Sequence, residues 1–548
     1  MSGGRPFVRQ LGLQPGVQLN PIVDETDGGI VIDQSDQVIA AVARLTRGRI
    51  DIPFRVHRDN FIRRTGQAES MRVNALNEAK LQVYEALRSG AASAVLMRSV
   101  SEAAKIKYAV VNFSGTPSGT EETVAFSVSE TAPTAGFSLY VRHLECFNDG
   151  IRLSVHADAT PPSGTPEANK VLTLRVLDAN SNLLYEITGS LDPAAVDDYG
   201  TTFYLPDVAA QLTLGLVEVF VAAGASVPVT SNAYGRTITN RPSWATSDTL
   251  FCFEEGDTVY TNADIDRFVS GLRGTTMRFG KLITGGSQNT ALINALITLV
   301  EGDVANARIK IDIPGNLSPE AAIAWRNAIG TDSEYVDFNY NTVVANDPMN
   351  GGRANWGVGG LQAAFECARN ARVNGRGFAP KNYAVAGREW PLNRDGMTLP
   401  RTFEDYELSD LAGAQVNPVI FATYSGGGRF IFGDSLTAYK STKSYMKLQS
   451  VMDRAVTIDL AVSSEAFAQT QKPMKQYIRE MGEFLQAYFE GAQASDWLKP
   501  ATSLPGNASF QFSISPNEAS PSDTVDVIYM LSYDGTVRRV MLSPKIVK

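Results

Sequence analysis

Few residues in this chain have the types and spacing that catalysis requires. The 548 residues include three histidines, His57, His143 and His156, and a Ser-His-Asp site would need one of them beside an activated serine. No GxSxG elbow and no HExxH sequence occurs. The sequence therefore predicts no catalytic residues. A hydrolase built on residues 257–395 is kept as an alternative, although that region contains no histidine.

Three glycine clusters resemble phosphate-binding loops only in composition. Gly351 to Gly360 precedes a predicted helix, but no strand runs tightly into it. Gly280-Lys281 lacks the Walker spacing, and Ser425 to Gly428 lies in a predicted hairpin. Turns and close backbone approaches explain these glycines better than a bound nucleotide does, so we predict no cofactor.

Charged residues gather in two segments near the N-terminus. Arg44 to Arg64 holds seven arginines, which favours either a solvated, salt-bridged face or a contact surface for another subunit. The carboxylates before this segment lack the spacing of a calcium loop and indicate a soluble linker; they are Asp24, Glu25, Asp27, Asp33 and Asp36. We therefore predict no metal site.

The composition argues against several classes of protein. The formal net charge is -9, whereas direct nucleic-acid binding needs an excess of Lys and Arg. No apolar stretch approaches the length of a membrane span, and the N-terminus lacks the apolar core of a signal peptide. Cys146, Cys252 and Cys367 are too sparse for a disulfide framework. We expect buried, reduced thiols in a protein that is made and kept in the cytoplasm.

Both ends of the chain are predicted to be extended arms. Residues 1–22 are rich in Gly and Pro, yet they contain apolar residues that an ordinary disordered tag lacks. Residues 534–548 form the second arm, and residues 536–548 carry four basic groups and no acidic group. Such segments find their binding partners elsewhere, and they suit an acidic surface.

The first half of the chain between the arms is predicted to have two parts. Residues 23–110 indicate an α/β unit, with a helix from Asn74 to Ser89 that stops at Gly90. In residues 111–245, Val, Thr, Ser and Tyr alternate between turn residues without a helical stretch. This pattern predicts a β-sandwich or barrel.

The second half is predicted to have two further parts. Strands and helices alternate in residues 246–399, as in a doubly wound parallel sheet, and Ser318-Pro319 starts one of the helices. Residues 400–533 have mixed α+β character, with a hairpin around Ser425 to Gly428, two long helices and two closing strands. The fold class expected for the whole chain is α/β and β multidomain.

Several segments resemble the contractile tail sheath family, in the order that the family has them. Cys146 to Val155 is similar to the entry into its β-rich module. Ile309 to Pro314 resembles a family strand that ends in Asp-x-Pro. Ala364 to Arg372 and then Gly375 to Asn382 resemble its "Ala-x-x-Arg … Gly … Ala-Pro-x-Asn" passage.

The C-terminal region continues this resemblance. Gly427 to Thr437 is similar to the family's Gly-rich hairpin and the turn after it, although Phe432 stands where the family usually has Trp. The two helices and the closing strands follow in the right order. Residues 111–145 have no counterpart that we can place.

The resemblance implies a structural protein rather than an enzyme. It implies a hollow tube of stacked six-fold rings around an inner tail tube protein, with baseplate and tail terminator at the ends and with subunits woven together by terminal arms. Contraction of a metastable lattice would drive the tube through the host cell envelope. The implied location is the tail of a virion assembled in the host cytoplasm, with a subtilisin-like α/β domain that lacks a catalytic triad.

Two sets of contact residues are expected on this basis. The arm residues that would bind other copies are Phe7, Val8, Arg9, Leu11, Val537, Arg538, Arg539, Val540, Met541, Ile546 and Val547. Lys475 and Arg479, on a predicted helix, are expected to contact the inner tube. Gly12 to Pro21 and Asp534-Gly535 are expected hinges.

A baseplate or receptor-binding protein, suggested by the β-rich part, is the other alternative to a sheath subunit.

Overall fold

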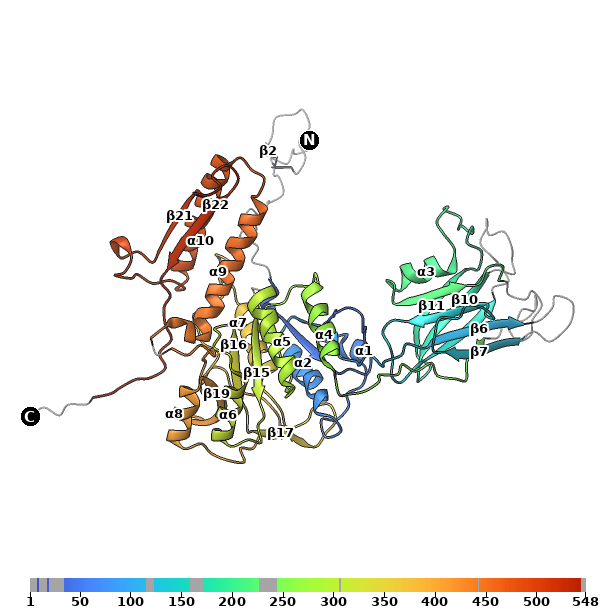
Figure 1. Cartoon of the computed structure of the whole chain (residues 1–548), viewed down its shortest axis with the longest axis horizontal. Coiled ribbons are helices and arrows are strands. Elements are labelled where there is room, and N and C mark those ends of the chain that lie inside the picture. Colours follow the sequence, from blue (N-terminus) through green and yellow to red (C-terminus); the bar gives the residue numbers. More distant parts are fainter. Residues whose placement is uncertain are drawn as a thin grey trace, which may run out of the picture. The chain divides into compact units, whose positions relative to one another are not determined.

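A computed structural model describes most of the chain (Figure 1). The described residues are 7–8, 17–18, 34–114, 123–157, 171–225, 244–304, 307–441 and 443–543. The predicted contact residues Arg9, Leu11, Ile546 and Val547 lie outside this part of the chain, as do Asp24, Glu25, Asp27 and Asp33. The chain divides into two compact units. The first comprises Met1–Gln34, Arg372–Pro380 and Ala461–Ser532, and the second Ser35–Ala371, Lys381–Leu460 and Tyr533–Lys548.

A mixed eight-stranded sheet organises the second unit, in the order β20-β19-β16-β15-β14-β3-β5-β4. Its strands are β3 (Val38–Ala43), β4 (Phe54–Val56), β5 (Ser93–Arg98), β14 (Lys281–Ile283), β15 (Arg308–Ile313), β16 (Val336–Tyr340), β19 (Val416–Tyr424) and β20 (Gly427–Phe432). The six inner strands are parallel, and β4 and β20 pair antiparallel at the edges. Three distant stretches of sequence thus build one sheet.

Helices cover both faces of this sheet. The helices of the sheet region are α1 (Phe61–Thr65), α2 (Glu78–Ser89), α4 (Asn262–Gly274), α5 (Thr290–Thr298), α6 (Pro319–Ile329), α7 (Gly359–Asn370) and α8 (Asp405–Gly413). Helices α4 and α5 share an apolar cluster with Val38 and Ile309. Helices α2 and α7 share another with Ile39 and Ile283, because successive side chains of a strand point to opposite faces. A two-stranded ribbon, β17 (Val344–Asn346) and β18 (Arg353–Asn355), precedes α7.

Local capping signals work as the sequence predicts. Helix α2 ends at Gly90, whose φ is 136°. The Ser318 side chain accepts a hydrogen bond from the Ala321 amide at the start of α6, and Pro319 occupies the first turn. The predicted hairpin is confirmed, because β19 and β20 pair across a two-residue turn at Ser425-Gly426.

Two four-stranded antiparallel sheets make up the β-rich part of the second unit. They are β12-β8-β6-β7 and β11-β10-β9-β13. Their strands are β6 (Tyr108–Ser114), β7 (Thr123–Ser129), β8 (Leu139–His143), β9 (Ile151–Ala157), β10 (Val171–Asp178), β11 (Leu183–Ser190), β12 (Val217–Val221) and β13 (Ala245–Thr246). Val141 of one sheet and Leu174 of the other belong to a single apolar cluster. Side chains from both sheets therefore form one core.

The expectation that residues 111–245 contain no helix is wrong. Helix α3 spans Leu205–Leu212 in this part of the chain. Pro206 lies in its first turn, and Leu205 and Ala209 are fully buried at i, i+4 spacing. The helix spans eight residues and is surrounded by strand-like sequence, so it shows only two turns of helical periodicity.

The first unit combines a long helix with a hairpin. It contains α10 (Met474–Ala494), the antiparallel pair β21 (Phe510–Pro516) and β22 (Val525–Leu531), and the parallel pair β1 (Phe7–Val8) and β2 (Val17–Gln18). Phe489 of α10 packs its ring against Phe510 and Tyr529 of the hairpin, at centroid distances of 5.4 and 5.7 Å. Helix α9 (Gln449–Ala468) precedes α10 in the sequence. No helix within the described ranges is long and apolar enough to cross a membrane.

Candidate functional site

The glycine-rich turn before α7 holds carboxylates of the protein itself. The amides of Val358 and Gly359 both donate to Asp312 Oδ1 at 2.8 Å, and the Gly357 amide donates to Glu78 Oε1 at 2.7 Å. A Cβ on Gly357 would lie 2.2 Å from Asp312 Cγ, so the glycine allows this close approach. The helix N-terminus, which attracts anions, is thus filled by Asp312. The interpretation of these glycines as a close backbone approach is confirmed.

Glu78 and Asp312 form an acidic pair at this turn. The amide nitrogen of Gln82 bridges them with hydrogen bonds of 2.8 Å to each carboxylate. Burial, and then repulsion by Asp312, raises the pKa of Glu78 to about 7. Protonation of Glu78 near neutral pH therefore relieves the repulsion between the carboxylates of Glu78 and Asp312.

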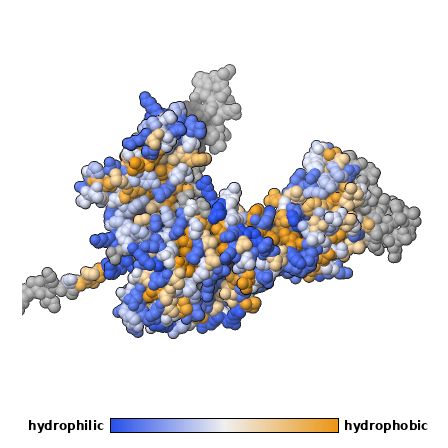
Figure 2. Space-filling view, in the orientation of Figure 1, coloured by the Kyte–Doolittle hydropathy of each residue, from blue (hydrophilic) through white to orange (hydrophobic). Residues whose placement is uncertain are grey.

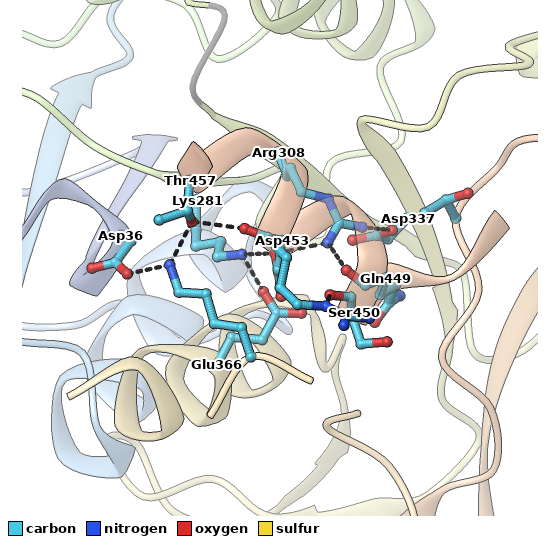
Figure 3. Close-up of polar contacts among 12 residues, drawn as sticks. Asp36, Lys281, Arg308, Asp337, Glu366, Gln449, Ser450, Asp453 and Thr457 are labelled. Atoms are coloured by element: carbon cyan, nitrogen blue, oxygen red, sulfur yellow. Dashed lines mark hydrogen bonds and ion pairs between the residues drawn. The ribbon is translucent and has the colours of Figure 1, made fainter. Parts of the chain in front are cut away.

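A second and larger group of charges lies inside the second unit (Figure 3). Four cations and three anions form this group, which we call the ion cluster: Lys281, Arg308, Lys310, Arg369, Asp337, Glu366 and Asp453. None of these side chains is more than 4% exposed. They come from β14, β15, β16, α7 and α9. The cluster lies on the face of the sheet that α7 covers, because Ile309 and Ile311 of β15 face the other side.

Asp453 of α9 is the central anion of the cluster, as Figure 3 shows. Its Oδ1 accepts from Lys281 Nζ at 2.6 Å and from Arg308 Nη1 at 2.9 Å. Its Oδ2 accepts from Arg369 Nη2 at 2.6 Å. A single carboxylate of α9 therefore accepts hydrogen bonds from side chains of β14, β15 and α7.

Opposite charges keep Glu366 and Asp453 ionised in spite of burial, whereas at Asp337 burial outweighs Arg308 and Lys310 and raises the pKa. Burial and the neighbouring Asp453 act to raise the pKa of Glu366, but the ammonium groups of Lys281 and Lys310 lower it to about 2. Burial likewise opposes ionisation of Asp453, and Lys281 and Arg308 hold its pKa well below the usual range. Buried charges of this kind are costly unless all are paired, so the network fixes one geometry rather than adding much stability.

Lys381 connects α9 to Asp36, which lies two residues before strand β3 of the central sheet. Lys381 Nζ donates to Thr457 Oγ1 of α9 at 2.6 Å and to Asp36 at 2.5 Å. Asp36 is thus a partner of a buried lysine rather than part of a solvated linker. The first turns of α9 are held by charge as well as by apolar packing.

The arginine-rich segment forms ion pairs within the chain. Arg44 pairs with Glu69 and Glu255, and Arg47 Nε donates to Asp149 at 3.1 Å. The remaining pairs are Arg49 with Asp51 and Arg64 with Glu145. These contacts support the interpretation as a salt-bridged face, and they link the segment to residues 145–149, between β8 and β9 of the β-rich part.

The histidines and the buried cysteines do not form a reactive group. His143 is buried, and burial lowers its pKa to about 4. His156 lies against Trp244 at a ring distance of 4.8 Å, and His57 lies on an exposed loop. Burial raises the pKa of the Cys146 and Cys367 thiols to about 12. These cysteines are protonated structural residues at neutral pH.

The described end of the C-terminal arm is exposed and apolar. Val537, Val540, Met541 and Leu542 are 72–88% exposed, and Figure 2 shows hydrophobic colours along this segment. No strand is assigned within residues 537–543. Arg538 forms an ion pair with Asp434. The C-terminal arm therefore presents to solvent a run of apolar side chains that normally favour burial.

The other predicted contact residues lie in the first unit. Lys475 and Arg479 are both exposed on α10, and Arg479 lies within 4.0 Å of Glu480 and Glu483. Phe7 and Val8 form strand β1, which pairs with β2.

The ion cluster, by contrast, is not among the sites that the sequence predicts. Its signal was visible in Arg308 to Asp312, where charged and apolar residues alternate along a predicted strand.

The fold of this chain is similar to that of a sheath tail protein of known structure. No family model and no curated protein sequence matches this chain. Among solved structures, the sheath tail protein from Listeria innocua superposes with a TM-score of 0.53 at 10% identity, over 90% of this chain and 94% of that protein. A sheath tail protein from Desulfitobacterium hafniense gives a TM-score of 0.46 at 12% identity, over 95% of this chain and 100% of that one. The sheath-type fold rests on the first of these.

Proposed function

We propose that this protein is the sheath subunit of a contractile tail or of a related injection machine. The observation that carries the proposal is the shared fold with a sheath tail protein over nine-tenths of both chains. The subunit would polymerise around an inner tail tube and contract to drive that tube through a cell envelope. Energy would be stored in the extended lattice and released as surfaces become buried.

The subunit would bind several partners. Other copies would form stacked six-fold rings, the inner tube would lie inside, and baseplate and terminator proteins would lie at the ends. Contacts that do not close on themselves generate open helical polymers. The particle would be a tail assembled in the host cytoplasm. No enzymatic step and no cofactor enters this mechanism.

The terminal arms would link neighbouring subunits by strand addition. The apolar arm residues Val537, Val540, Met541 and Leu542 are exposed, and residues 536–548 carry only basic charged side chains. In the described residues, the hairpin β21–β22 pairs with no third strand. Its free edges would accept strands from other copies, including the N-terminal segment around Phe7 and Val8.

The remaining sequence-based assignments belong to the same proposal. The six parts would be 1–22, 23–110, 111–245, 246–399, 400–533 and 534–548. The parallel sheet would be a subtilisin-like domain without a triad, and the β-rich part would be a sandwich. Lys475 and Arg479 would contact the inner tube, since both are exposed on α10, although an exposed helix face explains these residues equally well.

Negative-stain electron microscopy of the purified full chain tests the proposal. We expect rings or tubes. Deletion of residues 1–12 or 537–548 should leave folded, soluble monomers that no longer polymerise. Trimers in place of tubes would favour the receptor-binding alternative. Ordered tubes from either deletion would show that the arms do not link the lattice.

A further inference from the structure

The root of the C-terminal arm is fixed to the body of the second unit. Arg454 of α9 is fully buried, and its Nη2 donates to the Asp534 carbonyl at 2.6 Å. The hydroxyl groups of Ser450 and Thr536 are 2.9 Å apart. A Cβ on Gly535 would lie 2.9 Å from the ring of Tyr445, so this glycine fits closely against the aromatic side chain. The dipeptide Asp534-Gly535, an expected hinge, is therefore held on both sides.

One charged pair holds the arm beyond this root. Arg538 Nε donates to Asp434 Oδ1 at 2.7 Å, and its Nη2 contacts Oδ2, which gives a two-pronged pair. The two side chains are only 26% and 14% exposed. Asp434 lies two residues after the end of β20, and its Oδ1 also accepts from the Ser435 amide at 2.8 Å. The acceptor is thus oriented by the edge of the central sheet.

The chain beyond this pair is exposed, as Val537 already is on the near side of the pair. Residues 539–543 are all exposed, and Val540 to Leu542 present three large apolar side chains to solvent. The arm therefore consists of a fixed part, which ends at Arg538, and an open apolar part. A segment that already points in its binding direction loses less conformational entropy when it docks.

We propose that Arg538 and Asp434 form a positioning pair that sets the direction in which the C-terminal arm leaves the subunit. The hinge of the arm then lies at residues 539–543 rather than at Asp534-Gly535. The partner that the aimed arm meets is a second copy of this chain, so this part of the inference rests on the proposed function. The pair itself touches only this subunit.

Charge reversal tests the pair in the full-length chain. Arg538→Asp and Asp434→Arg each place like charges together, whereas the double variant restores an attractive pair with reversed sign. We expect each single variant to raise the critical concentration for assembly by about fivefold or more, and the double variant to return to within about twofold of the parent. Arg539→Asp is the matched control, because it changes the charge of the arm equally but leaves the pair intact.

Each outcome of this comparison decides the question. Recovery in the double variant, with little effect of Arg539→Asp, supports the positioning pair. Equal losses for Arg538→Asp and Arg539→Asp would mean that only the basic charge of the arm matters, and would overturn it. Single variants that assemble like the parent would overturn it as well.

A distance measurement separates this inference from the proposed function. Spin labels at Val537→Cys, next to the pair and before the hinge, and at Ser409→Cys on α8, in a Cys252→Ser background, report the direction of the fixed part of the arm in the dilute monomer. We expect a narrow distance distribution in the parent, a broad one in Arg538→Asp and a narrow one again in the double variant. A broad distribution in the parent overturns the pair, whether or not the protein forms tubes.

Discussion

The body of the second unit and its C-terminal arm place charged and apolar side chains in opposite ways. The body buries seven charged residues of the ion cluster at no more than 4% exposure each. The arm exposes Val540, Met541 and Leu542 by at least 72%. Internal charges fix the geometry of one subunit, since they tolerate only one arrangement. Exposed apolar residues have no such role in the monomer and become useful only when another surface covers them.

Removal of the central anion should produce the largest change in subunit stability. Asp453→Asn keeps the shape of the side chain but leaves Lys281, Arg308 and Arg369 without their shared counter-charge. We expect the free energy of unfolding to fall by about 3–5 kcal/mol. Thermal and denaturant unfolding of the 537–548 deletion, which should stay monomeric, measures this.

A surface pair provides the control for this variant. Asp149→Asn removes the partner of Arg47, but Asp149 is 39% exposed. The loss should stay below about 1 kcal/mol, because solvent screens such pairs. Equal losses for Asp453→Asn and Asp149→Asn would contradict the role of burial.

The next largest effect is expected at Glu78, in the acidic pair at the α7 turn. Here the substitution should raise the free energy of unfolding, whereas Asp453→Asn should lower it. The pKa of Glu78 is about 7 in the folded chain, against an ordinary value of 4.5. The folded state thus binds the extra proton, so the free energy of unfolding should fall as pH rises from about 4.5 to 7. Glu78→Gln should remove this dependence and stabilise the protein at pH 8 by about 1–3 kcal/mol.

Unfolding of Glu78→Gln and of the parent at a series of pH values checks this, and the difference between the two curves isolates Glu78. Glutamine can still accept the hydrogen bond from the Gly357 amide, so the turn should survive. Parallel curves for the two proteins would show that Glu78 does not hold the proton.

The arm should show almost no effect on stability and a large one on assembly. Met541→Asp, at an 88% exposed position, should change the free energy of unfolding by less than about 0.5 kcal/mol. Tube formation should nevertheless be lost, because a charge would have to be buried in the lattice. Sedimentation and electron microscopy measure assembly. Unimpaired tubes would show that this residue stays in solvent.

The smallest effect on the subunit is expected on α10. Arg479→Glu changes a side chain that is 67% exposed, so the free energy of unfolding should change by less than about 0.5 kcal/mol. Co-sedimentation with the inner tube protein should weaken if this helix faces the tube. Lys472→Glu, which changes the same charge just before the helix, serves as the comparison. Unchanged tube binding in Arg479→Glu would place the contact elsewhere.

Much of the local structure could be predicted from the sequence, because its causes are local. Ser318 and Gly90 act on backbone groups a few residues away, and the hairpin turn is formed by Ser425 and Gly426, which are adjacent in the sequence. The ion cluster could not be predicted in the same way. Arg308 and Asp453 are 145 residues apart, and no local pattern shows that their elements meet. Nor could the alternating charges of β15 reveal which helix would cover them.

The amino-acid sequence by itself predicted extended ends, set the basic and apolar character of the C-terminal one, and predicted many of the strands and helices, although not α3. These properties depend on composition and on short-range hydrogen bonds. Only the tertiary structure decided that three distant segments share one sheet and that charges are buried beneath α9. It also decided that Asp534-Gly535 is held rather than free. Such features arise from contacts with remote residues such as Arg454 and Tyr445, which sequence spacing cannot reveal.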